Sequence, residues 1–366
     1  MKRLTTLLST LVGLMSTNVF AEYGLNMTEG VTSISRDIYD LHMLIFWICV
    51  AIAVLVFGAM FYSVFAHRKS KGAVAAQFHE STKAELLWTV IPIIILVLMA
   101  IPASRVLIDL EDTSKADMTI KITGHQWKWQ YDYPTEGISF ISNLAQSSKD
   151  SVNDDSNKPE NYLLEVDKHL VLPVDTSIRF LITSNDVIHN WWVPDFGVKQ
   201  DANPGFINDA WAQIDEIGTY RGQCAELCGK DHGFMPIVVD VVSKADYAKW
   251  VTNQQAIAKA AADSANKTWS KSELMAQGES VYNTNCASCH KKDGSGMPPI
   301  FPAMKASPVA NGAPADHIGI VLHGKGGMPT FKMLGDADLA AVITYERNAF
   351  GNTGSVVQPS DVKSAR

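Results

Sequence analysis

The sequence lacks an excess of positive charge. Its 366 residues include 31 Lys and Arg against 38 Asp and Glu, a net charge of −7 at pH 7. Nucleic-acid binding depends on Lys and Arg that neutralise phosphates, so this balance excludes a nucleic-acid partner and favours cationic ones. Charged residues make up only 19% of the chain and hydrophobic ones 47%, gathered in a few long runs. This distribution indicates a membrane protein with two or three domains.

Cysteine is also scarce, with five in the chain. Four of them fall in two short motifs that predict metal or haem binding, and Cys49 lies alone in an apolar run. No structural disulfide is therefore expected.

Apolar segments organise the N-terminal third. Residues 1–21 combine Lys2 and Arg3 with a short apolar run and a cleavage site that ends in a small residue, as in a cleaved signal peptide. Within residues 22–112, the runs 42–66 and 86–107 are each long enough to cross a bilayer. The connection between them is basic, with His67, Arg68, Lys69, Lys71 and Lys83. The positive-inside rule then places this connection in the cytoplasm. The segments before the first run and after the second run would lie in the periplasm, so the chain would span a bacterial inner membrane twice.

Apolar and polar residues alternate after Asp117, as in β-strands. We expect strands at 118–123, 162–166, 178–183 and 235–242, separated by turn residues. These strands predict an all-β Greek-key sandwich or barrel within residues 113–252. The polar stretch 147–159 is expected to be a solvated insertion.

The C-terminal part changes character again. Residues 253–271 are Ala-rich and polar without a strong apolar stripe, which predicts a flexible linker, helical only in part. A capping box at Ser270 and Glu273 then predicts a helix ahead of Cys286, and 336–350 predicts a closing helix. Residues 272–366 should form an all-α domain.

One motif supplies donors suited to copper. Cys224-Ala-Glu-Leu-Cys228-Gly-Lys-Asp-His232-Gly-Phe-Met235 offers two thiolates, an imidazole and a thioether, and His189 upstream adds a second imidazole. A mononuclear blue-copper site needs one thiolate, so the second cysteine implies sulfurs that bridge two metal ions. Such a centre transfers electrons. The structural alternative is a disulfide between Cys224 and Cys228.

A second motif, Cys286-Ala-Ser-Cys289-His290, is typical of covalent c-type haem attachment, with His290 as an axial iron ligand. The sixth iron ligand must come from downstream. The candidates there are Met297, Met304, His317, His323 and Met328.

Together the motifs resemble subunit II of the haem-copper cytochrome c oxidases, in the caa3-like form with a fused C-terminal cytochrome c domain. The resemblance spans essentially the whole mature chain. It rests on Gly124-His-Gln-Trp-Lys-Trp-Gln-Tyr-Asp-Tyr133, His189-Asn-Trp-Trp-Val-Pro194, Gly222 to Pro236, and Glu85-Leu-Leu-Trp-Thr-Val-Ile-Pro92.

The resemblance implies a two-helix transmembrane hairpin, a cupredoxin-like domain and a class I cytochrome c domain. In the last of these, Gly326-Gly-Met328-Pro resembles the Met-Pro element, which favours Met328 as the sixth iron ligand. Six residues would hold a dinuclear copper centre, CuA: His189, Cys224, Glu226 through its carbonyl, Cys228, His232 and Met235.

Three further roles follow from the resemblance. The Glu226 carboxylate would bind Mg²⁺ shared with subunit I, Trp127 would be the residue through which electrons enter, and Glu85 would begin a proton path. Each residue also has a structural alternative. Glu226 could be a solvated loop acid, Trp127 could pack within a strand, and Glu85 could be a snorkelling surface group. Asp167 and Asp186 are expected as docking acids for a cytochrome. Phe206 stands where the family commonly has Arg, which puts strong docking of a free basic cytochrome c in doubt.

The implied function is that of an electron-transfer subunit. Electrons from cytochrome c or another periplasmic donor would reach haem c, then CuA, then haem in subunit I, supporting dioxygen reduction and proton pumping. Subunits I and III are the expected partners. A free-standing electron carrier and a copper-delivery protein are the alternatives, and Glu85 and Glu226 argue against both because each is useful only beside a partner subunit.

Overall fold

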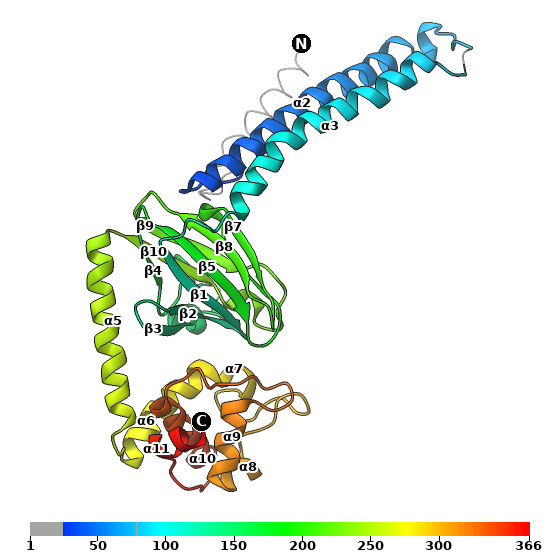
Figure 1. The fold of residues 1–366 in the computed structure, drawn as a ribbon. Helices are drawn as coiled ribbons and strands as arrows, with labels where there is room; N and C mark the ends of the chain where they lie inside the picture. Colours follow the sequence, from blue (N-terminus) through cyan, green and yellow to red (C-terminus); the bar gives the residue numbers. More distant parts are fainter. Residues whose placement is uncertain (1–24, 78, 155) are drawn as a thin grey trace.

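The computed structural model describes residues 25–77, 79–154 and 156–366, and the predicted signal peptide lies outside them. Three parts follow one another along the molecule (Figure 1). A helical hairpin leads into a β-domain, and helix α5 (Lys244–Ala265) joins the β-domain to a C-terminal helical domain.

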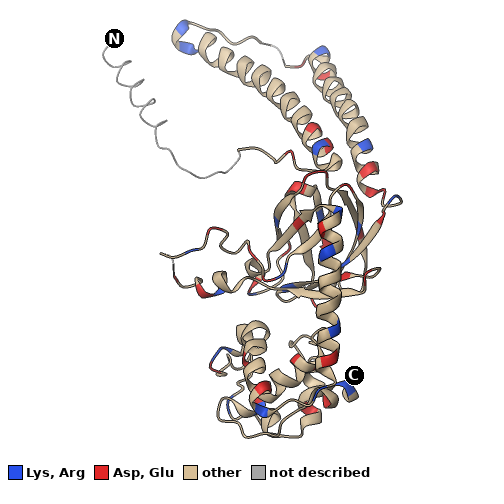
Figure 2. Ribbon diagram, turned by 90° about the vertical axis from the view of Figure 1, so that its left-hand side faces the viewer, with Lys and Arg blue, Asp and Glu red and all other residues tan. Residues whose placement is uncertain are grey.

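The hairpin consists of α2 (Ser33–Ala66) and α3 (Thr82–Glu111), with the short helix η1 (Lys69–Lys71) in the connection. Both long helices are apolar enough to cross a membrane, as predicted. Toward the β-domain both helices extend beyond the predicted spans, because their polar ends pack on that domain: Arg36 pairs with Asp215, and Trp211 Nε1 donates to Asp109 O at 3.0 Å. Basic residues gather at the opposite end of the hairpin (Figure 2).

The β-domain contains two five-stranded sheets. The first has the order β3-β2-β1-β5-β8, formed by Ile138–Ser142, Lys128–Tyr133, Met118–His125, Ser177–Ser184 and Asn208–Gln213. The second has the order β4-β10-β9-β6-β7, formed by Leu170–Pro173, Ile237–Val242, Gly218–Cys224, His189–Val193 and Val198–Ala202. β1 pairs with β5 and β4 with β10 in parallel; the other pairs are antiparallel. The core between the sheets includes Ile120, Trp129, Phe180 and Trp191, all fully buried.

Three of the four predicted strands are confirmed as β1, β5 and β10. The strand predicted at 162–166 is wrong. This segment forms turns, with a single bridge from Val166 to Leu144, and Leu163 adopts a positive φ of 61°. Its amide donates to Ser148 Oγ at 3.1 Å instead of to a strand. Ser148 belongs to α4 (Gln146–Asp150), inside the predicted polar insertion.

Helix α5 differs from the predicted flexible linker. It runs without a break into the residues assigned to the linker, since alanine favours helix and the Ser243 side chain caps its first turn. Its first half packs on the β-domain, where Trp250 lies 5.0 Å from the Tyr133 ring and Gln255 Nε2 donates to Glu136 O at 2.9 Å. Residues 256–263 are exposed.

The C-terminal domain is helical, as predicted. Its helices are α6 (Lys271–Asn285), α7 (Ala287–His290), α8 (Pro308–Asn311), α9 (Pro314–His323), α10 (Asp336–Asn348) and α11 (Pro359–Ala365). The Ser270–Glu273 capping box is present. Helices α6 and α10 cross closely at Gly278, where an added Cβ would lie 2.1 Å from Ala341 O.

This crossing gives a matched pair of substitutions. Gly278→Ala should destabilise the helical domain by about 1–3 kcal/mol, since the methyl group must push α10 away. In α9, a Cβ added at Gly319 would have no atom within 4 Å. Gly319→Ala should therefore stabilise the helical domain by up to about 1 kcal/mol, because alanine has a higher helix propensity than glycine. Thermal unfolding of the two variants measures both effects, and equal midpoints would contradict the close crossing.

A charged cluster ties the segment before β4 to the second sheet. His169 Nδ1 lies 2.7 Å from Asp240 Oδ2 and its Nε2 lies 2.8 Å from Glu165 Oε1. Arg221 Nη2 also bonds Glu165 Oε2 at 2.8 Å, and Thr219 Oγ1 donates to Asp240 at 2.7 Å. The hydrogen bond to Asp240 raises the pKa of His169 above its usual value, although burial opposes it.

Because the pKa of His169 is raised in the folded state, its contribution to stability is complete below the unfolded pKa of about 6.5 and is lost as pH rises through the folded value. We therefore expect His169→Gln to lower the unfolding temperature at pH 6 more than at pH 9. The difference at low pH should correspond to roughly 1 kcal/mol. Parallel melts of His323→Gln, at an exposed position, provide the control. A pH-independent difference would rule out this linkage.

Candidate metal centre and haem-attachment segment

Neighbouring strands bring the predicted copper ligands together. β6 begins at His189 and β9 ends at Cys224, and the two strands are paired through Trp191 and Cys224. The loop after β9, here called the copper loop (residues 225–236), returns through η3 (His232–Phe234) to β10. Cys224, at the end of β9, and Cys228, in the copper loop, therefore lie near the start of β6.

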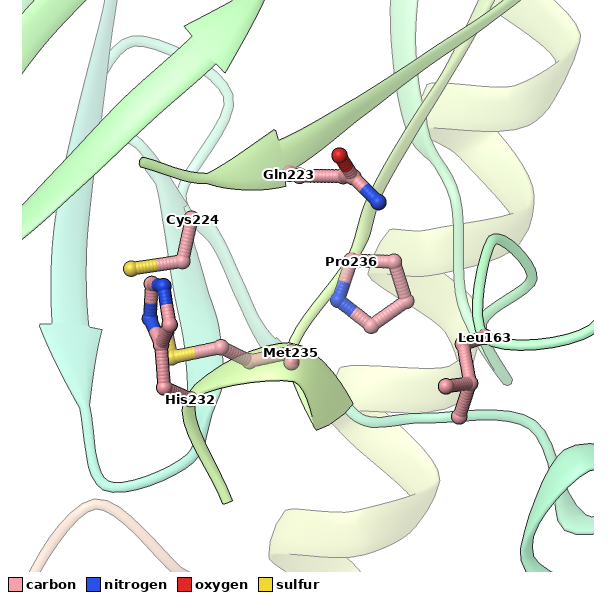
Figure 3. A pocket seen from close by; sticks show the side chains of 7 residues that line it. Leu163, Gln223, Cys224, His232, Met235 and Pro236 are labelled. Carbon is pink, nitrogen blue, oxygen red and sulfur yellow. The ribbon is translucent and has the colours of Figure 1, made fainter. Parts of the chain in front are cut away.

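The donor atoms surround the two sulfurs. Cys224 Sγ lies 3.9 Å from Cys228 Sγ, 3.9 Å from His189 Nδ1 and 3.4 Å from the Glu226 carbonyl oxygen. Cys228 Sγ lies 3.4 Å from His232 Nδ1 and 3.5 Å from Met235 Sδ. A disulfide requires about 2.05 Å between the sulfurs, so these cysteines are free thiols. Figure 3 shows Cys224, His232 and Met235 pointing toward one another in the pocket.

The cluster is largely shielded from water. Only 7% of Cys224, 2% of Cys228 and 1% of Met235 is exposed, and His189 is fully buried. Hydrogen bonding from Cys228 lowers the pKa of Cys224 to about 3, against the effect of burial. The same contact, together with burial, raises the pKa of Cys228. The lowered pKa favours the thiolate form of Cys224, and soft metal ions select thiolates in such dry sites.

Asp186 does not act as an exposed docking acid, contrary to the prediction. Only 11% of its side chain is exposed; Oδ1 lies 2.8 Å from His189 Nε2, and Oδ2 accepts the Gln126 amide at 2.7 Å. Because Asp186 engages Nε2, the ring presents Nδ1 to Cys224. Asp167 likewise accepts hydrogen bonds from Asn143 at 2.7 and 3.1 Å, within a loop.

A glycine makes room for this histidine. At Gly124, a Cβ would lie 2.7 Å from His189 Cδ2. The backbone of β1 therefore approaches the imidazole ring directly, and a larger side chain would displace the ring from the cluster.

Trp127 contacts the copper loop. Its Nε1 donates to the Cys228 carbonyl at 3.2 Å, beside the Gln126 side chain, which donates to the same oxygen at 2.9 Å. Gly229 has a φ of +118°, and a Cβ there would lie 3.1 Å from Trp127 Cζ2. Of the aromatic run, Trp129, Tyr131 and Tyr133 are buried core residues, which leaves Trp127 half-buried against the cluster.

The two predicted acids lie apart from the cluster's sulfurs. The Glu226 side chain is exposed, while its carbonyl faces Cys224. Glu85 lies exposed in the first turn of α3, near the hairpin connection.

The haem-attachment motif begins directly after α6 and includes all of α7. Cys286 follows α6, and His290 Nδ1 lies 2.8 Å from Pro302 O, which leaves Nε2 as the nitrogen available to iron. Cys286 and Met328 both pack against the core of the helical domain.

The rival ligands differ in their surroundings. His317 Nε2 bonds Glu346 at 2.9 Å and both side chains are buried, whereas His323 is exposed. Met297 is 41% exposed and Met304 lies in the core at 8%. The two cysteines of the motif and the Nε2 atom of His290 thus suit haem c, and Met328, which packs against the core, is the candidate sixth ligand.

Comparisons with known proteins agree with this arrangement. The families "Cytochrome C oxidase subunit II, transmembrane domain" and "Cytochrome C oxidase subunit II, periplasmic domain" match residues 21–106 and 118–242. A Rickettsia bellii protein named "Probable cytochrome c oxidase subunit 2" is 39% identical over 257 residues, which cover 68% of this chain and 93% of the relative. The chain belongs to the cytochrome c oxidase subunit 2 family.

Other members and a fused module complete the comparison. Cytochrome c oxidase subunit 2 of Arabidopsis thaliana is 38% identical over 231 residues, 63% of this chain and 89% of the relative. The periplasmic domain of subunit II of cytochrome oxidase from Bradyrhizobium japonicum is 43% identical, covering 39% of this chain and 97% of that one, with a TM-score of 0.36. The family "Cytochrome C oxidase, cbb3-type, subunit III" matches residues 273–345.

Membership confirms the resemblance seen in the sequence, including the fused cytochrome c-type domain. This subunit 2 is a membrane protein, part of an oxidase complex in which it transfers electrons in association with other oxidase subunits. The subunit 2 family implies copper and the cytochrome c-type domain implies haem c.

Sequence reasoning missed several residues of the site. Asp186 lies three positions before His189, and this spacing of a carboxylate and a metal-binding imidazole was an available signal. Lys128 and Lys230 contact the helical domain at Asn285 and Ser288. No local signal could reveal those contacts, since their partners lie far along the chain.

Proposed function

We propose that this chain accepts electrons through a covalently bound haem c and passes them through a dinuclear CuA centre to haem in subunit I. It would thereby support dioxygen reduction and proton pumping. The observation that carries the proposal is the convergence of two imidazoles, a thioether and a backbone carbonyl on two free sulfurs 3.9 Å apart.

Each proposed residue has a definite task. His189, Cys224, Glu226 O, Cys228, His232 and Met235 hold copper; Cys286, Cys289, His290 and Met328 hold haem. When bound, the two groups would supply one-electron chemistry, which needs no bond to be made or broken. The protein keeps the donors fixed and dry, so that they move little when the charge changes.

The remaining roles rest on placement. The exposed Glu226 carboxylate is free to bind Mg²⁺ shared with subunit I, and Trp127 joins the domain surface to Cys228 through one hydrogen bond. Glu85 would begin a proton path on the cytoplasmic side. The basic hairpin connection supports that side and a bacterial inner-membrane location, with the β-domain and the helical domain in the periplasm (Figure 2).

Electron paramagnetic resonance of the oxidised protein tests the proposal. An unpaired spin shared equally by two copper nuclei is expected. A spin confined to one copper, or no bound copper in a folded protein, would refute it. Copurification with a larger haem-bearing subunit, and retention of copper against a chelator, would separate this function from a free carrier and from a copper-delivery protein.

The contact between Asp186 and His189 leads to a prediction. Asp186→Asn retains the size of the side chain but removes the carboxylate that orients the imidazole, so copper affinity should fall about 10–100-fold. Copper content after dialysis against a graded chelator measures this. Asp167→Asn is the control, because Asp167 contacts Asn143 and not a proposed copper ligand. Equal copper retention in the two variants would remove Asp186 from the site.

A further inference from the structure

The helical domain contacts the β-domain through two lysines. Lys128 Nζ donates to Asn285 Oδ1 at 2.9 Å and lies 4.9 Å from the centre of the Phe331 ring. Lys230 Nζ donates to the Ser288 carbonyl at 2.8 Å. We name these five residues the docking contact. Figure 1 shows α7 on the side of the helical domain that faces the β-domain.

Each member of the docking contact lies within three residues of a proposed electron-transfer residue. Lys128 directly follows Trp127, and Lys230 lies in the copper loop. Across the contact, Asn285 and Ser288 adjoin the two haem-attachment cysteines, and Phe331 lies three residues after Met328. The two lysines therefore join the redox segments of the two domains to each other.

Lys128 has the character of a specific interface residue. It is only 4% exposed, and its partners are an amide oxygen and an aromatic ring. Burial lowers the pKa of Lys128 to about 8. A buried ammonium group is costly unless its N–H groups and charge are satisfied, so its position depends on Asn285 and Phe331 remaining in place.

Helix α5 also favours contact between the helical domain and the β-domain. Its first half is fixed to the β-domain through Trp250 and Gln255, and its end meets the helical domain, where Trp269 Nε1 donates to Ser264 O at 3.0 Å. Its 22 residues span about 33 Å. A helical connection restricts the positions open to the second domain far more than a coil does, which raises the effective concentration of the docking surfaces.

We propose that Lys128 and Lys230 are positioning residues that hold the haem-attachment segment against the copper loop, so that electrons cross between the domains in one docked state and not during free diffusion of a tethered domain. This inference rests on the proposed function. Both lysines donate to uncharged oxygens, so the docked state should depend little on ionic strength, in contrast to docking between oppositely charged surfaces.

The test compares Lys128→Met, Lys230→Met and Lys249→Met in the assembled, full-length oxidase. Lys249 is the control, since it pairs with Asp246 on exposed α5 and its loss changes the charge equally. Hydrogen exchange of the backbone amides of residues 285–290 and 228–232 should accelerate in the first two variants and stay unchanged in the third. Lys230→Arg, which keeps an N–H donor, should restore protection.

A reduction pulse followed by optical detection supplies the second measurement. Transfer from haem to copper should slow about tenfold in each docking variant, the factor by which one lost charge-assisted hydrogen bond reduces the docked population. The wild-type rate should stay within about twofold between low and high salt.

The outcomes separate this proposal from the function on which it rests. Intact haem and copper spectra with wild-type exchange and wild-type rates in both variants would overturn the docked state and leave the proposed function standing. Absence of haem or of the dicopper signal in the wild-type protein would overturn the function itself. If Lys128→Met fails to fold, the half-exposed Lys230 still decides the matter.

Discussion

Cys228→Ser should abolish the dicopper centre and reduce oxidase turnover to background. The substitution replaces a sulfur that contacts Cys224, His232 and Met235 by a hydroxyl oxygen, which is a harder donor, reaches less far and stays protonated at neutral pH, so it cannot take the place of a bridging thiolate. The loss in turnover should exceed about 100-fold, because substitutions of residues that merely contact a metal ligand already reduce activity by up to about 100-fold. Copper analysis and electron paramagnetic resonance measure the first effect, and oxygen uptake measures the second.

Two controls separate the loss of copper from a general loss of folded protein. Cys49→Ser removes a thiol from exposed α2 and should leave copper, haem and turnover unchanged. Haem absorbance of Cys228→Ser should also remain, since Cys286 and Cys289 lie in another domain. If Cys228→Ser still showed a spin shared by two copper nuclei, the bridging role of this sulfur would be wrong.

The copper site was largely predictable from sequence because its donors lie in short, chemically distinctive motifs. Five of the six proposed donors lie in one short stretch, from Cys224 at the end of β9 to Met235 in the copper loop, so only His189 had to be brought in by the pairing of β6 with β9. The membrane helices and strands β1, β5 and β10 were predictable for a similar reason, because hydrophobic periodicity is local.

The failures involve interactions that composition does not encode. Residues 162–166 have the composition of a strand, but the positive φ of Leu163 and its bond to Ser148 turn the segment away from both sheets. The predicted linker forms part of α5, because one face of its first half finds Tyr133 and Glu136 far away in the sequence. Asp186 was misread as a surface acid, since burial by His189 and Gln126 depends on the folded sheet.

Trp127→Phe should slow electron transfer from haem to copper by about 10–100-fold while leaving both centres in place, a range typical for removing a group beside a metal ligand. Phenylalanine retains an aromatic ring against Gly229 but lacks the N–H group that Trp127 donates to the Cys228 carbonyl. The hydrogen bond that joins the half-buried indole to the backbone of a proposed copper ligand would therefore be lost. Transient absorption after a reduction pulse measures the rate in the assembled oxidase.

The matched control for this variant is Trp192→Phe, which alters a half-buried tryptophan of β6 that stacks with Lys199. It should reduce neither the rate nor the copper signal.

Hydrogen exchange separates an effect of the indole from an effect of domain docking. Lys128 adjoins Trp127 and would hold the helical domain in place in either variant. Slow electron transfer with normal protection at residues 285–290 would assign the loss to the indole itself, whereas slow transfer with faster exchange would assign it to the docked state. A wild-type rate in Trp127→Phe would mean that electrons reach Cys228 by another route, of which the Lys230–Ser288 contact is the nearest at 2.8 Å.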